Sequence, residues 1–262
     1  MDRLSNFKTR IDFIYNSNAI ESSTLTLKET DIILQYGVTV KGKSLKEHEE
    51  VKGQEYALNF LKEVIKTNES LSLRLIREFH ALVLNDDIEN RGTFKKSNNE
   101  ILGAGFETTP YYLVEEKLTE LIEKFNSSEN NDLIMKVACF HADFEKIHPF
   151  IDGNGRTGRL LLNLELMKNG YPITVIRNED RDEYYTALET AQVESNYELL
   201  ADFIEKSVEN TFWMYYKYFD EDTKMKFEEY LKKNGINPKE VYRKRFEDYP
   251  ETEKDFPRDW KK

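Results

Sequence analysis

The chain has 262 residues, 39% of them hydrophobic, and its 49 acidic and 38 basic residues give a net charge of −11 at pH 7. This apolar content supports a sizeable core and excludes a wholly disordered chain, while the acidic balance argues against a non-specific binder of nucleic acid. No apolar run is long enough to span a membrane, and the charged N-terminus lacks an apolar signal segment. Because the single cysteine also rules out an internal disulfide, we expect a soluble cytoplasmic protein.

The first third of the chain is predicted to be helical. Apolar spacing indicates helices over 5–15 and 45–65, with a short helical turn over 17–21. Thr26 and Glu29 form a capping-box pattern that opens a helix ending at Gly37. Either Ser70 or Ser72 caps the next helix, whose apolar residues run from 75 to 83.

The segment 91–110 interrupts this pattern, because its glycines, its Asn98-Asn99 pair and Pro110 are typical of turns. We expect a short β-hairpin over 96–106. Helical spacing resumes afterwards, and the predicted helices are 114–125, 133–147, 155–168, 180–192, 196–219 and 224–233. The absence of an alternating strand–helix pattern predicts an all-α fold.

Three regions follow from this reading. Residues 1–68 form an N-terminal helical region, 69–219 form the core, and 220–262 form a charged C-terminal helix followed by a loosely held tail.

A match to the phosphate-binding P-loop pattern occurs at residues 37–44, GVTVKGKS. That loop requires a preceding buried strand in a parallel sheet. The residues before Gly37 have a helix cap and helical spacing, so we interpret the match as a connection between two helices.

The segment 148–159, HPFIDGNGRTGR, combines the groups that phosphoryl or nucleotidyl transfer needs. Its glycines and Asn154 lead into a helix, so backbone N–H groups converge on a site suited to phosphate. Arg156 and Arg159 lie three residues apart in the first turns of that helix, where two cations are unfavourable without an anion. Asp152 is a hard oxygen ligand suited to Mg²⁺, and His148 suits proton removal near neutral pH.

This segment resembles the signature of the Fic family, HPF-x-[DE]-G-N-G-R-x-x-R, at every fixed position, and the resemblance extends over about residues 70–200. It implies a Fic-type helical bundle with a β-hairpin flap over the site. It also implies transfer of AMP from ATP, with Mg²⁺ or Mn²⁺, to a Ser, Thr or Tyr hydroxyl of a target protein. In this resemblance His148 acts as the general base and Asp152 holds the metal ion. Gly153, Asn154 and Gly155 surround the phosphates, and Arg156 and Arg159 contact the β- and γ-phosphates.

The resemblance also implies how partners bind. The flap, which includes Gly103, Ala104 and Gly105, docks the target in extended form by β-augmentation. Possible targets include the chain itself, and a homodimer is possible, whereas neither nucleic acid nor a membrane is an expected partner. Tyr184 and Tyr185, and less clearly Gln192 and Asn196, are candidates for an adenine pocket, although tyrosines at helical spacing are more often part of a core.

Residues 17–21, SNAIE, are similar to the first five positions of the family's inhibitory motif, [ST]-x-x-x-E-[GN], and Ser22 departs from it at the sixth. A carboxylate is attracted to an arginine in an empty phosphate site. We therefore expect Glu21 to form a bidentate pair with Arg159 and to occupy the position of the γ-phosphate, with Ser17 in the same motif. The alternative is an ordinary helix cap and a solvated acid.

Two other functions stay open. One is a Fic-fold enzyme of another reaction, such as removal of AMP or transfer of a different phosphate-containing group, and the other is a non-catalytic regulatory module. His141 is expected to be a hydrogen-bonded core residue, and His48 and His80 lack partners at metal-binding spacing, so no zinc site is predicted.

Overall fold

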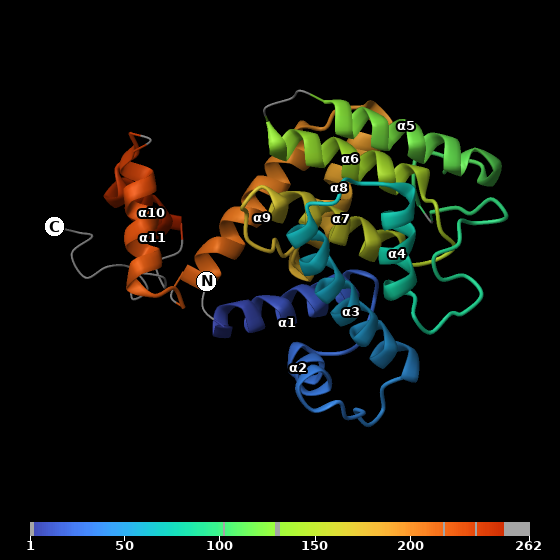
Figure 1. Cartoon of the computed structure of the whole chain (residues 1–262), viewed down its shortest axis with the longest axis horizontal. Helices are drawn as coiled ribbons and strands as arrows, with labels where there is room; N and C mark the ends of the chain where they lie inside the picture. Colours follow the sequence, from blue (N-terminus) through green and yellow to red (C-terminus); the bar gives the residue numbers. More distant parts are fainter. Residues whose placement is uncertain (1–2, 102, 129–131, 217, 234, 249–262) are drawn as a thin grey trace. The chain divides into compact units, whose positions relative to one another are not determined.

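The computed structural model describes residues 3–101, 103–128, 132–216, 218–233 and 235–248, which form helices and no strands (Figure 1). The all-α prediction is confirmed for this part of the chain. Its α-helices are α1 (Arg3–Ile20), α2 (Leu27–Tyr36), α3 (Leu45–Thr67), α4 (Leu73–Val83), α5 (Val114–Ser127), α6 (Leu133–Ile147), α7 (Asn154–Lys168), α8 (Arg181–Glu194), α9 (Glu198–Tyr216), α10 (Glu221–Lys233) and α11 (Pro238–Asp248). None of these helices combines the length and apolar character needed to cross a bilayer.

Local capping explains where the N-terminal helices begin and end. Thr26 and Glu29 form the capping box that opens α2, and Gly37 ends this helix with a left-handed φ of 64°. Ser44 caps α3 through a second capping box with Glu47. The P-loop-like segment is therefore a connection between α2 and α3, with no strand before it.

The helices that carry the predicted site pack at the centre of residues 10–209, which form one compact unit. Here α6 and α7 lie against each other, α3 and α4 cover α7, and α5 and α8 cover α6 (Figure 1). Ile20, at the end of α1, belongs to the same buried cluster as residues of α6, α7, α8 and α9. This packing brings the end of α1 to the start of α7.

The second compact unit combines the described residues of 3–9 and 210–248. It contains α11, a helix that the charged sequence did not predict. Tyr242 of α11 is buried in an aromatic cluster with Trp213 and Tyr216, and the Tyr216 and Tyr242 hydroxyls are 2.8 Å apart. The tail is therefore helical and anchored as far as residue 248, and residues 249–262 lie outside the described chain.

The predicted β-hairpin is wrong for the described residues of 96–106, which form turns and bends, and Leu102 lies outside the description. The polar groups here bond to the loop after α6 and not across two strands. The Lys95 N–H donates to Pro149 O (2.9 Å) and Asn99 Nδ2 donates to Phe150 O (2.9 Å). Lys95 Nζ also donates to Thr108 Oγ1 (3.1 Å). These bonds join the segment to other parts of the chain, whereas a hairpin needs backbone bonds between its own two strands.

Candidate active site

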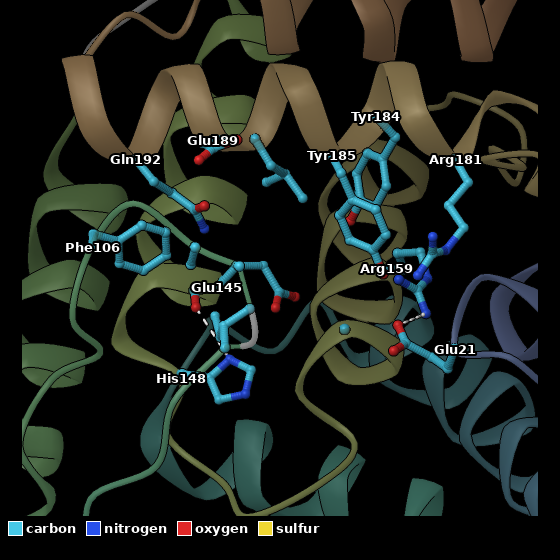
Figure 2. A pocket seen from close by; sticks show the side chains of 15 residues that line it. Glu21, Phe106, Glu145, His148, Arg159, Arg181, Tyr184, Tyr185, Glu189 and Gln192 are labelled. Carbon is cyan, nitrogen blue, oxygen red and sulfur yellow. Dashed lines mark hydrogen bonds and ion pairs between the residues drawn. The ribbon is translucent and has the colours of Figure 1, made fainter.

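One pocket of about 500 Å³ contains most of the predicted site (Figure 2). Four parts of the unit surround it: the end of α1, the described residues of 101–106, the facing ends of α6 and α7 with their connection, and one face of α8. The lining residues are Glu21, Ile101, Gly103, Ala104, Phe106, Glu145, His148, Gly155, Arg159, Arg181, Tyr184, Tyr185, Leu188, Glu189 and Gln192.

His148 lies at the C-cap of α6 with a left-handed φ of 50°. Pro149 follows it and cannot continue the helix. The ring Nδ1 is 3.3 Å from Glu145 O, so Nδ1–H donates to this carbonyl and Nε2 keeps its lone pair (Figure 2). Burial lowers the pKa of His148 to about 4. The imidazole is therefore neutral at pH 7 and able to accept a proton.

The loop between α6 and α7 is held from both sides. Asn154 accepts a hydrogen bond from Phe150 N and donates one to Phe150 O, both at 2.9 Å. His80 of α4 stacks on the Phe150 ring, accepts from Gly92 N at 2.9 Å and donates to Asp152 O at 2.9 Å. The start of α7 has no side-chain cap among the described residues, and Gly153, at φ 76°, precedes it. The first N–H groups of α7 therefore remain available to an anion.

Arg159 is 2% exposed, and its donors converge on the end of α1. Nη2 donates to Glu21 Oε1 (2.7 Å) and to Ser17 O (2.8 Å), and Nε donates to Ser17 Oγ (3.1 Å). Burial acts to lower the pKa of Arg159, but Glu21 holds this pKa above its ordinary value. The structure thus places Glu21 against Arg159 through one N–H, in place of the expected bidentate contact, and Ser17 receives the other bonds.

Gly155 permits this arrangement. A Cβ at this position would overlap Glu21 Oε1 and would lie 3.0 Å from Arg159 Nη1. The space above Gly155 is therefore the place where an anion meets both Arg159 and the start of α7. In this structure the Glu21 carboxylate fills that space.

Ser22 explains why α1 ends beside Arg159. Ser23 N donates to Asn18 O (3.1 Å) and Ser22 N donates to Ala19 O (2.9 Å), which is a Schellman ending. This ending requires a left-handed residue at position 22, and Ser22 has a φ of 74°. The family motif has Gly or Asn at this position, the two residues that adopt this conformation most easily. Ser22 therefore keeps the usual geometry of the helix end at a conformational cost.

Replacing Ser22 with glycine is expected to stabilise the protein by about 1 kcal/mol, because glycine adopts a positive φ without a steric penalty. For a chain of this size the melting temperature should rise by about 2–4 °C. Thermal unfolding of Ser22→Gly and of the neighbouring control Ser23→Gly measures the effect. Ser23 lies outside the left-handed region, so its variant should gain nothing. Equal shifts in the two variants would contradict the argument.

Arg156 and Asp152 lie outside the lining of this pocket. Arg156 is buried, with Nη1 at 3.2 Å from Glu50 and Nη2 at 3.3 Å from Asp152. The Asp152 carboxylate is 47% exposed and also lies 3.4 Å from Lys46 Nζ. Although burial acts to raise the pKa of Asp152, Arg156 and the Gly153 N–H keep it below the ordinary value. Asp152 is therefore ionised and accessible.

The donor set around Asp152 fits a metal ion that arrives with a ligand. In the described residues no group of three or more His, Cys, Asp or Glu side chains could hold a metal ion. A single exposed carboxylate suits Mg²⁺, which commonly keeps waters and shares substrate phosphates with one or two carboxylates.

Most of the residues predicted for the flap and for the adenine pocket line the cavity. Gly103, Ala104, Tyr184 and Tyr185 line it, whereas Gly105 packs near Glu189 on its rim. Tyr184 is only 1% exposed. Its hydroxyl is 2.7 Å from Nε2 of His141, a buried histidine as predicted.

Glu145 is one of the pocket residues that the sequence did not predict, with Arg181, Leu188 and Glu189. It lies three residues before His148 on α6 and is buried. Burial raises the pKa of this carboxyl to about 8, against the attraction of Arg159. The sequence feature that could have indicated Glu145 is an acidic residue on the apolar face of the predicted helix 133–147.

Comparisons with known proteins identify relatives of this chain. The Fic/DOC family model matches residues 70–166, which include α4 to α7 up to Leu166. Protein adenylyltransferase fic-1 from Caenorhabditis elegans is 37% identical over 186 residues, which cover 69% of this chain. The chain spans only 36% of the length of that curated relative.

Solved structures are also similar to this one, and two of them illustrate the match. Fic-1 from C. elegans has a TM-score of 0.75 and 32% identity, and the match covers 82% of this chain and 66% of that one. A Fic-domain-containing signaling protein from Bacteroides thetaiotaomicron has a TM-score of 0.71 and 31% identity, with 79% of this chain and 83% of that chain covered. Because a family model matches its central helices and its sequence and fold are similar to those of these proteins, the chain belongs to the Fic family.

Proposed function

We propose that this chain is a protein adenylyltransferase that moves AMP from ATP to a Ser, Thr or Tyr hydroxyl of a target protein. The observation that carries the proposal is one pocket lined by a neutral His148, by Arg159 and by Gly155 at the uncapped start of α7. The curated relative from C. elegans is named a protein adenylyltransferase, which supports the same reaction.

In this reaction His148 Nε2 takes the proton of the target hydroxyl. The hydroxyl oxygen then forms a bond to the α-phosphorus of ATP, the α–β phosphoanhydride bond breaks, and pyrophosphate leaves. The α7 N–H groups of Asn154 and Gly155, together with Gly153 at the cap, would stabilise the developing negative charge. Arg159 would hold the terminal phosphates, and Arg156 would add positive charge while it orients Asp152.

Glu21 would act as an inhibitor of this site, because its carboxylate occupies the space that a phosphate needs above Gly155. Ser17 would fix the inhibited geometry by accepting from Arg159 Nε at 3.1 Å and from Gln54 Nε2 at 3.1 Å. Activation then requires that the Glu21 side chain leave Arg159.

The target would lie along the segment 101–106, with its hydroxyl near His148. This segment has no strand in its described residues, so pairing with an extended target would give it strand geometry on binding. Tyr184 and Tyr185 would contact the nucleotide from α8. Self-modification and a homodimer fit the same proposal.

The test is incubation of the Glu21→Gly variant, which lacks the proposed inhibitory carboxylate, with ATP labelled at either the α- or the γ-phosphate. Adenylyl transfer predicts protein labelling from α-label and release of the γ-label with pyrophosphate. Labelling from the γ-position would indicate phosphate transfer. Release of AMP from a modified protein would indicate the reverse reaction, and no reaction with any donor would favour a non-catalytic module.

Activity is expected to require Mg²⁺ or Mn²⁺ held by Asp152 with the phosphates of ATP, since a hard carboxylate prefers these ions. Asp152→Ala should reduce the rate and raise the metal concentration needed for half-maximal activity. The matched control is Asp31→Ala, because Asp31 accepts a hydrogen bond from Gln35 on the surface of α2. Full turnover in excess chelator would exclude a metal requirement.

A further inference from the structure

Glu145 is a buried acid to which the mechanism above assigns no role. It lines the pocket from α6 and is 6% exposed, yet its Oε1 has no hydrogen-bond partner among the described residues. Figure 2 shows its carboxyl directed into the space between His148 and Arg159. A buried polar group without a partner is costly, so such a group in a cavity points to a missing ligand.

The fold makes room for this carboxyl. A Cβ at Gly158 would overlap Glu145 Oε1 and would lie 3.0 Å from Cε1 of His141. Arg159 does not satisfy Glu145, because Nε and Nη2 of Arg159 donate to Ser17 and Glu21. The carboxyl therefore lies close to the guanidinium without bonding to it.

We propose that Glu145 is a neutral hydrogen-bond donor to the nucleotide bound in this pocket, a role that rests on the proposed function. A triphosphate carries several negative charges into the same cavity, and an ionised Glu145 would repel it. A protonated carboxyl has an O–H that an oxygen of the nucleotide can accept. Ionisation of Glu145 then sets the alkaline limit of ATP binding.

The charged and titratable groups around Glu145 come from each element packed against it. They are Glu21 beside the end of α1, His141 and His148 from α6, Arg159 from α7, and Tyr184 and Tyr185 from α8, with Arg181 and Glu189 of α8 lining the same pocket. Burial lowers the pKa of both histidines, to about 3 and about 4, and raises the pKa of both tyrosines. These four groups therefore keep their protonation between pH 7 and pH 9.5, whereas Glu145 has a pKa of about 8.

Titration of Lys95 is a competing explanation for any change in ATP affinity between pH 7 and pH 9.5. Burial lowers its pKa to about 8, and its Nζ is 3.4 Å from Ile147 O, next to His148. Glu145→Gln separates the two groups, because glutamine keeps a donor and the shape of the side chain, cannot ionise, and leaves Lys95 in place.

The experiment measures the Kd of ATP with Mg²⁺ by calorimetry in the full chain carrying Glu21→Gly and His148→Asn, which removes the competing carboxylate and turnover. Between pH 7 and pH 9.5 this parent should lose about tenfold or more in affinity, because only the neutral carboxyl binds. Adding Glu145→Gln should abolish the pH dependence. Adding Glu145→Leu should also give a flat profile, but with several-fold weaker binding at pH 7.

A flat profile in the parent, or the same slope in the Glu145→Gln variant, would overturn the role of Glu145 while leaving the proposed function intact. Binding as tight with leucine as with glutamine at pH 7 would exclude hydrogen-bond donation. No ATP binding by the parent at any pH would overturn the proposed function as well. Far-UV circular dichroism of each variant checks that it is folded.

Discussion

Glu21→Gly is expected to raise the initial rate of AMP incorporation by about tenfold or more. The Glu21 carboxylate and a phosphate of ATP compete for Arg159 and for the space above Gly155. A charge-assisted hydrogen bond contributes about 1.5–3 kcal/mol, equivalent to one to two decades in competing affinity. Because the Glu21 side chain is 36% exposed, solvent screens the pair, and the lower end of this range applies.

Two further variants test the cause of this increase. Glu21→Gln keeps the length of the side chain and the helix ending but removes the charge, so it should give an intermediate rate. The double variant Glu21→Gly with Arg159→Ala should be slower than Glu21→Gly alone, since Arg159 also aligns the terminal phosphates. If Glu21→Gly is no faster than the unmodified chain with any target, including itself, the inhibitory role of Glu21 is wrong.

The parts of the fold that the sequence predicted well depend on local interactions. The capping boxes at Thr26 and Ser44 act within four residues, so both helix starts follow from the sequence. The turn after His148 is likewise set by Pro149 and by the glycines that follow. The contact between Glu21 and Arg159 is not local, and only the family resemblance made it predictable.

The parts that the sequence did not predict depend on distant partners. Asn99 was expected in a hairpin turn, but its side chain and that of the neighbouring Lys95 donate hydrogen bonds to residues 147–150, about fifty positions along the chain. The ion pair between Arg156 and Glu50 also joins distant parts of the chain, because Glu50 lies on α3. Most residues of helix α11 are charged, and Tyr242 is its one fully buried aromatic residue. The sequence therefore lacks the repeated apolar spacing that indicates a helix.

His148→Ala is expected to reduce AMP transfer by about 10²–10⁴-fold, the usual contribution of a general base, while ATP binding remains. The neutral ring offers Nε2 to the target hydroxyl, and the phosphates are held by other groups, chiefly Arg159 and the start of α7. Since the pKa of His148 is lowered to about 4 by burial, the imidazole stays unprotonated as the pH falls from 7 to 5. The base itself should therefore cause no loss of rate in that range.

The backbone at this position calls for a second variant. His148 has a left-handed φ of 50°, and alanine is strained in that conformation by about 1–2 kcal/mol, whereas asparagine adopts it more easily. His148→Asn should therefore keep the loop and the melting temperature closer to those of the unmodified chain, yet be as inactive as His148→Ala. Initial rates, ATP affinity by calorimetry and thermal unfolding of both variants separate loss of the base from loss of the loop. If His148→Asn transfers AMP at a rate close to that of the unmodified chain, another group removes the proton.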